Sequence, residues 1–444
     1  MDTTLEHDID VILLDEGEAT EAGTRYEVAV VRKALGEVVK ASQQAESKAT
    51  KRAVKWAEPR IPYSTLLYFF DTNTIHRACI DIKAQLIGGL GWSLVTEDED
   101  TSQDKVYAAL HELLSNPQPE RTLGEGRDTL TEILYQFVTD WDSLGNAYLE
   151  LPRNANGQVA EIYHVRAAKM RRDLKPCGGY HEVRSGTVKA SFRGWNAEMP
   201  QEANEVVHLR EYDPLDDFYG MPTWLPSLAA QLLDRTAVEY NTHLFQNGLM
   251  AHFAIIVEGG KLEKSEIAGI KRYVKNNATG IRNAGRGMVL QHASGTVKIR
   301  IEKLNMDVKD LMIDKLRGGL RDEVISGHRV PPRLLGVMHA GALGGGGEVE
   351  GQLKIFMQSV IRPKQQRLED FLNHTIVASY GGEDGLAGVK WRIKLSEMDI
   401  TNRGADASYF EKALDPQKGW MQRSEVRQEQ GLPAEEDETS EEED

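Results

Sequence analysis

The residues that could carry chemistry are few, and the most conspicuous are the glycines between Gly336 and Gly347 and the acids that follow them. A phosphate-binding loop needs Gly-x-x-x-x-Gly-Lys-Ser/Thr, because the lysine reaches the phosphates and the hydroxyl binds magnesium. Here Glu348, Val349 and Glu350 follow the glycines, and two carboxylates would repel a phosphate. The segment is therefore not a phosphate cradle, and its composition alone favours a flexible linker.

The patterns of the common catalytic sites are missing. The chain contains no Gly-x-Ser-x-Gly, no His-Glu-x-x-His, no Cys-x-x-Cys and no Walker lysine. Its two cysteines, Cys79 and Cys177, stand far apart in the chain, so they predict neither a metal site nor a disulfide framework. We expect a protein that is not an enzyme, with no cofactor and no metal site.

The histidines and the paired aspartates are interpreted as structural residues. Asp216-Asp217 lies in a segment rich in Pro and Gly, where carboxylates usually hydrogen-bond a turn. A lone histidine on a helix or strand is more often a structural residue than a ligand. Four histidines fall on predicted elements: His76, His164, His208 and His243.

Charge is distributed unevenly along the 444 residues, whose formal net charge is −16. The last ten residues hold eight acids and no base, and eight acids precede the first base, Arg25. Both ends are expected to be solvated tails. The acidic N-terminus is not a signal peptide, and no run of eighteen apolar residues exists, so no membrane span is expected.

The charge balance reverses between Lys261 and Arg333, where sixteen Lys or Arg stand against eight Asp or Glu. One interpretation is a solvated face. The other is contact with DNA or with an acidic partner. The sequence leaves both open.

Two predicted helices flank the glycines. Apolar residues recur at helical spacing over 309–328 and again over 353–377. Pro331 and Pro332 end the first helix, since proline lacks the N–H donor, and Pro363 should kink the second.

This stretch resembles the portal proteins of tailed bacteriophages. The resemblance rests on Pro331-Pro-Arg-Leu-Leu-Gly336, on the loop of small residues, and on Ile361-Arg-Pro363 inside the helix that follows. In that family the parts correspond to a stem helix, the tunnel loop and the kinked tunnel helix. A further match is Asp213–Pro222, which carries a Tyr-Gly pair just before a long helix, predicted over 223–246. Gly220 is expected to permit a sharp turn, and Pro222 to set φ at the start of the helix.

The other predicted elements agree with such a fold. An aromatic segment, 63–70, precedes a helix for which Asp71 or Thr72 offers the N-cap. Further predictions are a strand over 92–95, helices over 103–115 and 128–143, a hairpin turning at 154–157, and a β-rich stretch over 179–210. Strands are also expected over 253–257, 287–290 and 296–301, and a strand over 389–395 is expected to return to the wing sheet.

The resemblance implies an α+β portal-like fold with an α/β wing, long stem helices, a small α/β clip insert, a kinked tunnel helix and a helical C-terminal crown. The implied parts are a flexible acidic N-terminal arm (1–58), the N-terminal part of the wing (59–220), stem helix (221–250), clip (251–306), stem helix (307–332), tunnel loop (333–352), tunnel helix (353–378), wing return strand (379–400), crown (401–433) and disordered acidic tail (434–444).

The resemblance also implies site residues. The loop facing DNA would hold Val337, Met338, Leu343, Gly344, Gly345, Gly346, Gly347, Glu348 and Val349. The clip residues facing the terminase would be Lys264, Lys271, Arg272, Lys275, Arg282 and Arg286. The stem interface between copies would use Leu232, Leu233, Leu316, Leu320 and Val324.

The implied function is a homo-oligomeric ring, a dodecamer, at one capsid vertex of the virion, through which double-stranded DNA is packaged and ejected. Its expected partners are the terminase large subunit, head–tail connector proteins, and the major capsid and scaffold proteins, with assembly in the host cytoplasm. Two alternatives stay open: a nucleic-acid-processing enzyme with a basic middle, and a capsid adaptor without DNA contact. Imaging separates the portal from both alternatives, because only the portal requires a closed ring.

The basic clip generates a prediction. Charge reversal at several of its six listed Lys and Arg residues should weaken binding of an acidic packaging motor, and the loss should diminish as salt is raised, because salt screens exposed charges. Binding is measured between purified proteins across a salt series. Binding that changes with neither salt nor mutation would leave only the solvated face.

Overall fold

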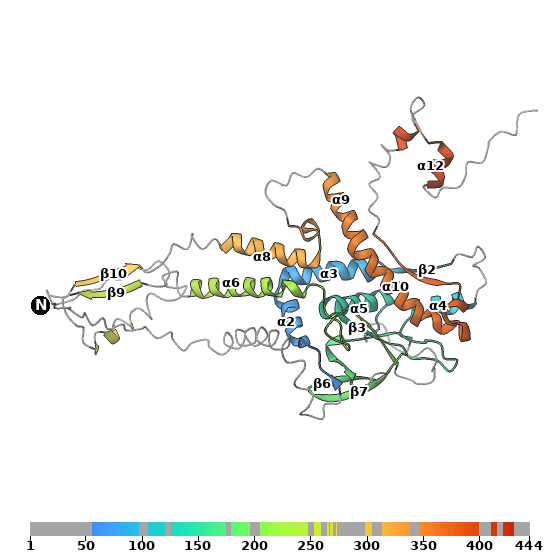
Figure 1. Ribbon diagram of the computed structural model, residues 1–444, viewed down its shortest axis with the longest axis horizontal. Coiled ribbons are helices and arrows are strands. Elements are labelled where there is room, and N and C mark those ends of the chain that lie inside the picture. The colour runs from blue at the N-terminus through green and yellow to red at the C-terminus, as the bar shows by residue number, and fades with distance from the viewer. Residues whose placement is uncertain are drawn as a thin grey trace, which may run out of the picture.

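The fold is α+β, as expected, with a body of helices and sheet and a projection built on two long helices (Figure 1). The structure is a computed structural model, and it describes residues 56–96, 105–119, 126–174, 179–195, 205–246, 253–258, 264–265, 267–269, 272, 298–303, 313–337, 346–398, 410–414 and 421–429. The expected N-terminal arm, except for residues 56–58, and the whole acidic tail lie outside the described residues.

Helix α5 (Leu130–Leu144) is central to the body, and its sequence defines both of its ends. Thr129 and Glu132 form a capping box, and Gly145 ends the helix with φ of 73°. Phe137 and Trp141 on its inner face are completely buried. Helices α2, α3 and α4 accompany it, over Tyr63–Thr72, Thr74–Gly88 and Lys105–Ser115.

The N-cap predicted for α3 was wrong. The aromatic segment is itself helical and runs through Thr72, whose hydroxyl donates to the carbonyl of Tyr68 at 2.7 Å. Asn73 stands between the helices in an extended conformation, and its side-chain oxygen accepts from the N–H of His76 at 2.9 Å. Asn73 therefore caps α3, because the hydroxyl of Thr72 is already hydrogen-bonded within α2.

Seven of the described strands form one sheet in the order β1-β5-β6-β7-β8-β3-β4. The strands pair antiparallel except for β7 and β8, which pair parallel. Their bounds are β1 (Trp56–Ala57), β3 (Asn146–Glu150), β4 (Tyr163–Val165), β5 (Met170–Asp173), β6 (Tyr180–Arg184), β7 (Thr187–Gly194) and β8 (Glu205–Arg210).

The turn predicted between β3 and β4 is confirmed at Asn154–Gly157. The side chain of Asn154 accepts from the N–H groups of Asn156 and Gln158, and Gly157 takes a positive φ of 78°. Beyond the turn the two strands pair with Tyr148 opposite Val165. An asparagine and a glycine thus fix this hairpin, as turn chemistry requires.

The projection consists of α6 (Leu228–Gln246) and α8 (Ile313–His328), which run side by side away from the body toward β9 (Phe253–Glu258) and β10 (Lys298–Lys303) (Figure 1). Strands β9 and β10 pair antiparallel. The helices lie inside the ranges predicted for them. The strand predicted over 287–290 lies outside the described residues.

The second helix begins earlier than expected. Helix α9 covers Gly346–Phe356, a π-helical turn covers Met357–Ile361, and α10 covers Arg362–Thr375. The prediction that Gly346 and Gly347 are loop residues was therefore wrong, since both lie in the first turn of α9. The N–H of Arg362 donates to the carbonyl of Met357, five residues back. This π turn stands immediately before Pro363, whose ring and missing N–H disfavour a regular helix there.

Strand β11 (Arg392–Leu395) pairs with β2 (Trp92–Val95), a strand of the region predicted as the wing, and the two form a separate sheet beside the seven-stranded one. Side chains of α10 hydrogen-bond the backbone of β11. Asn373 accepts from the N–H of Ile393 and donates to its carbonyl, and Glu369 accepts from the N–H of Leu395. Gln365 donates to the carbonyl of Ser396. These side chains stand four residues apart on one face of α10 and fill the place of a third strand.

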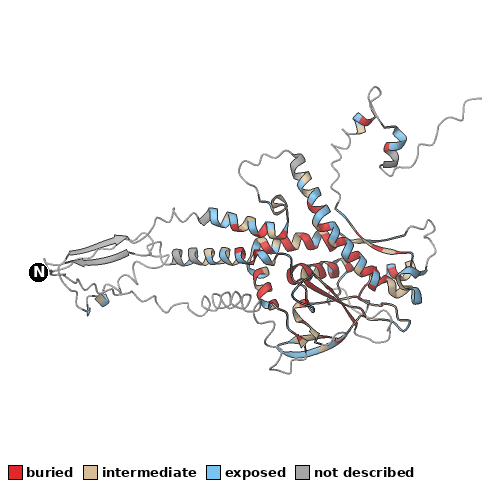
Figure 2. Ribbon diagram, in the orientation of Figure 1, coloured by how far each residue is buried: buried red, intermediate tan, exposed pale blue. Residues whose placement is uncertain are grey.

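Short turns and a terminal helix complete the described chain. The turns are η1 (Ala167–Lys169), η2 (Leu225–Ser227), η5 (Pro332–Leu335), η7 (Val377–Tyr380) and η8 (Gly382–Gly388), and the helix is α12 (Arg423–Glu429). Buried residues concentrate in α3, α5 and α10, and the outer part of α8 is mostly exposed (Figure 2). The main core thus lies in the body, and the projection carries little of it.

Candidate subunit interface and the polar junction beneath it

Of the five residues predicted to join copies along the stem, two face solvent. Leu233 on α6 is 46% exposed and Leu316 on α8 is 42% exposed. Residues three or four positions away on the same helices are also exposed: Ala229 and Thr236 on α6, and Gly319 on α8. An exposed stripe of apolar and small residues is a surface that another helix can cover.

The remaining three residues pack against other residues of the same chain. Leu320 and Val324 are 6% and 1% exposed and form a small core with Ala230 of α6, against which Ile75 packs. Leu232 packs against the core cluster that contains Tyr219 and Trp224. Near the body α6 and α8 therefore bury these residues within the chain, against each other and against neighbouring elements such as α3.

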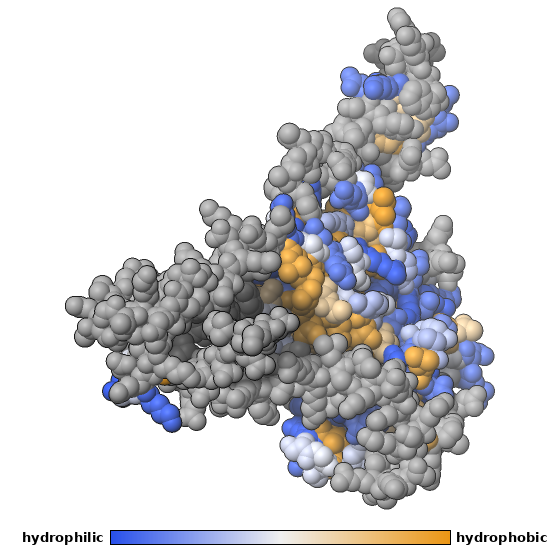
Figure 3. Space-filling model, turned by 60° about the vertical axis from the view of Figure 1, so that its left-hand side comes forward, coloured by the Kyte–Doolittle hydropathy of each residue, from blue (hydrophilic) through white to orange (hydrophobic). Residues whose placement is uncertain are grey.

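The surface beside the stem also carries apolar area. In Figure 3 hydrophobic atoms gather in a band across the middle of the face shown, and hydrophilic atoms dominate the side of the body beyond it. Ile355 on α9 is another large apolar residue that is exposed. Contiguous apolar surface of this kind marks contact sites between proteins.

The predicted loop facing DNA is described only at its edges. Val337 is half-buried and packs against the main core, so it is anchored to the body. Helix α9 contains the backbone of Gly346, Gly347, Glu348 and Val349. The other four residues of that prediction lie outside the described residues: Met338, Leu343, Gly344 and Gly345.

The basic residues of the predicted clip are also only partly described. Lys264 and Arg272 are exposed, as a contact surface for an acidic partner requires. Lys271, Lys275, Arg282 and Arg286 lie outside the described residues.

The Tyr219-Gly220 pair fastens the start of the stem to the body. Gly220 needs to be glycine because of a close approach, since a Cβ there would lie 2.3 Å from the carbonyl oxygen of Gly145. Asn146 holds Gly220 from both sides, accepting from its N–H at 2.8 Å and donating to its carbonyl at 2.9 Å. The hydroxyl of Tyr219 donates to the carbonyl of Ala57. The expected turn is thus present, but contact with Gly145 decides the residue type.

Pro222 was expected at the start of the stem helix, but it lies before it. Its carbonyl accepts from the N–H of Leu225 at the start of η2, and α6 begins only at Leu228. The paired aspartates serve the turn, since Asp216 accepts from the N–H groups of Phe218 and Tyr219. This confirms their interpretation as turn residues.

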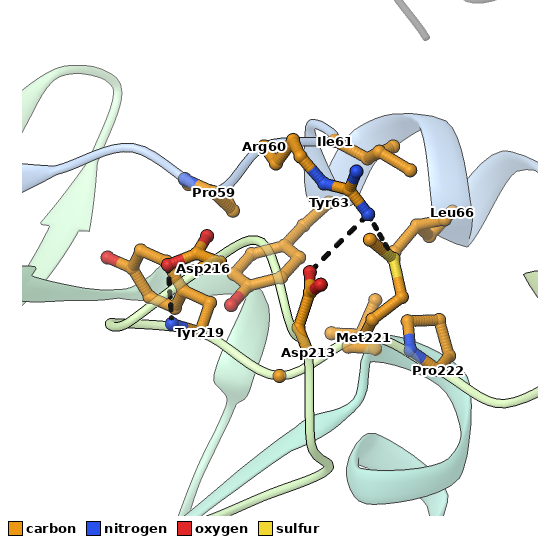
Figure 4. A pocket seen from close by; sticks show the side chains of 12 residues that line it. Pro59, Arg60, Ile61, Tyr63, Leu66, Asp213, Asp216, Tyr219, Met221 and Pro222 are labelled. Atoms are coloured by element: carbon orange, nitrogen blue, oxygen red, sulfur yellow. Dashed lines mark hydrogen bonds and ion pairs between the residues drawn. The ribbon is translucent and has the colours of Figure 1, made fainter. Parts of the chain in front are cut away.

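A small pocket beside this turn is lined by residues that contact one another (Figure 4). The guanidinium of Arg60 points into it and lies 3.4 Å from the carboxylate of Asp213 and 3.6 Å from the sulfur of Met221. These contacts join the segment before α2 to the loop before the stem. The pocket is therefore explained by structural contacts.

Sequence reasoning missed a set of buried polar residues where the stem meets the body. We call this set the buried polar chain, and it consists of Gln231, His76, His328, Lys83, Asp142, Lys364 and Glu211. It begins on α6, crosses α3, α8 and α5, and ends on α10 and the loop after β8.

Hydrogen-bond chemistry fixes the tautomers along this chain. The ammonium of Lys83 only donates, so Nδ1 of His328, 2.9 Å away, must accept from it. The proton of His328 then lies on Nε2, which donates to Nδ1 of His76 at 2.8 Å. His76 therefore carries its proton on Nε2, and no described residue accepts from that atom.

Two ammonium groups share one carboxylate at the centre of the chain. Lys83 lies 2.5 Å and Lys364 2.8 Å from opposite oxygens of Asp142, which is fully buried. Burial alone would raise the pKa of Asp142, but Lys364 and Lys83 hold it well below its usual range. Removing one member of such a buried pair costs roughly 3–5 kcal/mol, because a charge is left without its partner.

The ends of the chain are polar as well. Lys364 also lies 3.2 Å from Glu211, which Arg367 binds at 2.8 Å. Burial would lower the pKa of Lys364, but Asp142 and Glu211 raise it above the ordinary value. Charges therefore alternate in sign from Lys83 through to Arg367, so each buried charge has an opposite neighbour.

One signal in the sequence marks this site. Lys83 stands four residues from Cys79 and from Ile87, on the apolar face of a predicted helix, and a lysine on such a face must find a buried partner. The identity of the partner is not readable, because Asp142, His328 and Lys364 come from distant segments. Among the described residues, no group of three or more His, Cys, Asp or Glu is placed to hold a metal ion. Within the same residues, no helix has the length and apolarity to cross a membrane.

Comparison with known proteins gives one family. Residues 74–431 match the family described as Phage portal protein. The chain is 25% identical over 240 residues to the probable portal protein of Escherichia phage P2, covering 53% of this chain and 65% of that protein. It is 23% identical over 234 residues to the probable portal protein of Haemophilus phage HP1, covering 52% of this chain and 64% of that protein. The matches thus span just under two thirds of these relatives' length.

Solved structures share the fold. The neck of an empty GTA particle, computed with C6 symmetry, has a chain with a TM-score of 0.59 and 19% identity, covering 89% of this chain and all of that one. The neck of a native GTA particle, computed with C12 symmetry, has a chain with a TM-score of 0.56 and 18% identity, covering 90% of this chain and all of that one. At these identities the likeness establishes the fold.

The buried histidines generate a prediction about pH. Burial lowers the pKa of His76 to about 3, of His328 to about 2 and of His208 to about 3. The histidines of the unfolded chain have pKa values of about 6.5. Between the folded and the unfolded pKa values, the unfolded chain therefore binds more protons than the folded chain. Stability is therefore complete above the unfolded value and falls as pH is lowered, each histidine contributing up to ~1.4 kcal/mol per pH unit. The melting temperature should drop steeply between pH 6 and pH 4 (roughly the window set by these pKa values).

The same measurement on His208→Gln should show a shallower slope, because one of the three groups no longer titrates. His374→Gln, at an exposed position on α10, is the matched control and should keep the wild-type slope. An equal flattening in both variants would contradict the assignment.

Proposed function

Because the chain belongs to the phage portal protein family, we propose that it assembles into a closed ring at one capsid vertex and forms the channel through which double-stranded DNA enters and leaves the virion. Portal proteins are structural, non-enzymatic capsid components, which agrees with the absence of catalytic patterns in the sequence. The observation that carries the proposal is the family match over residues 74–431. That range contains the stem helices α6 and α8, the glycine-rich segment 337–349, which we call the glycine loop, and α10.

The stem supports ring formation. Leu233 and Leu316 leave apolar surface exposed on a thin projection, where the described part of the chain has few other elements to cover it. A second copy that covers this stripe with a different face makes a heterologous contact, and such contacts repeat until the ring closes. Twelve copies are the number we propose, since a structure of the same fold is computed with C12 symmetry.

The glycine loop suits a sliding contact with DNA. Residues 337–349 contain no Lys or Arg. Each contact between a lysine and a phosphate adds affinity through counterion release, and that contact would have to be broken at every step of translocation. We therefore propose that the loop and the first turn of α9 line the narrowest part of the channel, with Met338, Leu343 and Val349 as their bulkier contacts. Val337 anchors the loop to the body.

The proposed partners follow from this position. The end of the projection, with the exposed Lys264 and Arg272, would dock the terminase large subunit and later the head–tail connector proteins. The major capsid and scaffold proteins would surround the body at the vertex, and assembly would take place in the host cytoplasm. A nucleic-acid-processing enzyme or an adaptor that makes no DNA contact would need no closed ring.

Ring formation is tested by substitution of the exposed stem residues. Leu233→Asp with Leu316→Asp should abolish rings seen by negative-stain imaging and by light scattering, because two desolvated carboxylates would face the neighbouring copy. The melting temperature should stay close to wild type, since both side chains are exposed in the isolated subunit. Leu320→Asp is the contrasting variant and should lower the melting temperature, because Leu320 is buried within the chain. Rings that survive the double substitution would contradict the stem interface.

The channel role is tested by deletion of Gly344–Gly347. Rings should still form, since the deletion spares the stem stripe, but packaging of DNA or its retention should fall. Lysines introduced in the loop should slow translocation more at low salt than at high salt. Wild-type packaging and retention after the deletion would reduce the segment to a linker.

A further inference from the structure

The buried polar chain lies where the stem helices α6 and α8 meet the body and α10. Gln231 and His328 stand on the stem helices α6 and α8, and Lys364 stands at the start of α10. Between them, Lys83 of α3 and Asp142 of α5 belong to the core of the body. A continuous path of polar contacts thus joins the stem to α10 through two helices whose residues contribute to the main core.

Helix α10 carries α9 with it. The two are joined through the π turn at Met357–Ile361, where Ile361 is completely buried. Past the turn, Gln365, Glu369 and Asn373 bind α10 to Leu86 and to β11. These contacts tie α10 to the body, but the contact between Lys364 and Asp142 is the one that connects α10 to the path toward the stem.

Buried ion pairs are weak evidence for stability. The cost of taking charges out of water often equals or exceeds their mutual attraction, so apolar residues of similar volume can replace them without loss of stability. Their best-attested use is to fix one arrangement among several that would pack equally well. The geometry here has the features of that use: directional contacts of 2.5–2.9 Å at Lys83, Asp142 and His328, all of them buried.

We propose that the buried polar chain positions α10, and through it α9 and the glycine loop, relative to the stem. Asp142 is its fixed point: Lys83 and His328 set the stem side, and Lys364 sets the side of α10. These are positioning residues and touch no DNA. The role of the loop in this inference rests on the proposed function, whereas the positioning of α10 against α8 is a property of the single chain.

The test measures the distance between α8 and α10 directly. Spin labels are placed at Glu323→Cys on α8 and Gln366→Cys on α10, both exposed positions, in a background with Cys177→Ser, because Cys79 is buried. Lys364→Met keeps the pair of Lys83 and Asp142 and removes the contacts that α10 makes through Lys364 with Asp142 and Glu211. We expect the distance distribution to broaden, or its mean to move by about 1–2 Å, the size of helix shifts in known transitions. Lys354→Met, at an exposed lysine on α9 that pairs within its own helix, is the matched control and should leave the distribution unchanged.

A second variant separates position from stability. Lys83→Met, Asp142→Leu, His328→Leu and Lys364→Met together replace the centre of the chain by apolar side chains, and Glu211 keeps Arg367 as its partner, so no charge of the chain is left without an opposite neighbour. The melting temperature should equal or exceed that of wild type, while the distance distribution broadens and DNA retention by assembled rings falls. If this variant does not fold, Lys364→Met alone decides.

The outcomes are distinguishable. A distance distribution that stays at wild type in Lys364→Met overturns the positioning role, whether or not rings form. A wild-type protein that forms no rings or retains no DNA overturns the proposed function, but the distance between the labels in the single chain still tests the positioning role.

Discussion

Asp142 is the buried charge at which α3, α5, α10 and the foot of the stem make contact. It is buried inside the core helix α5, and it binds Lys83 of α3 and Lys364 of α10 through opposite oxygens. Its backbone carbonyl also accepts from the indole of Trp224, at the foot of α6, at 3.0 Å. A carboxylate in such a place is tolerable only with its partners present, so the helices that supply them are held in one arrangement.

A second constraint acts at the same foot of the stem, and it is steric. Gly145 ends α5 with a positive φ, and Gly220 lies against its carbonyl so closely that neither position has room for a side chain. Asn146 accepts from the N–H of Gly220, and the hydroxyl of Tyr219 in the same loop donates to the carbonyl of Ala57. The start of α6 is therefore placed by the end of α5, and the stem leaves the body in a direction that the core determines.

These two constraints explain how a thin projection can work as part of a larger assembly. Near the body, Leu320 and Val324 are buried within the chain, and farther out Leu233 and Leu316 remain exposed. The inner part of the stem is thus stabilised by folding, and the exposed side chains leave the apolar surface that the proposed contact between copies would use. On α8 the change comes one turn farther from the body, whereas on α6 it follows the face of the helix, since Leu232 packs against a core cluster and its neighbour Leu233 is exposed.

The sequence by itself determined the elements and the family. Helical periodicity located α5, α6 and α8, turn residues located the hairpin at Asn154–Gly157, and proline located the disturbance at Pro363, because each of these signals is local. It was misleading where a local signal had competitors. Thr72 is an acceptable N-cap, yet its hydroxyl is bonded inside α2, and Gly346 and Gly347 begin a helix despite their low propensity.

Only the tertiary structure decided which stem residues are free to contact another copy, why Gly220 must be glycine, and where β11 pairs. It alone also brought together Asp142, Lys83, His328 and Lys364. The physical reason is that a buried charge identifies itself in a sequence by standing on an apolar face, as Lys83 does, but the partner that makes its burial tolerable can come from any distant segment. Local patterns fix what each segment forms, whereas long-range contacts choose which segments meet.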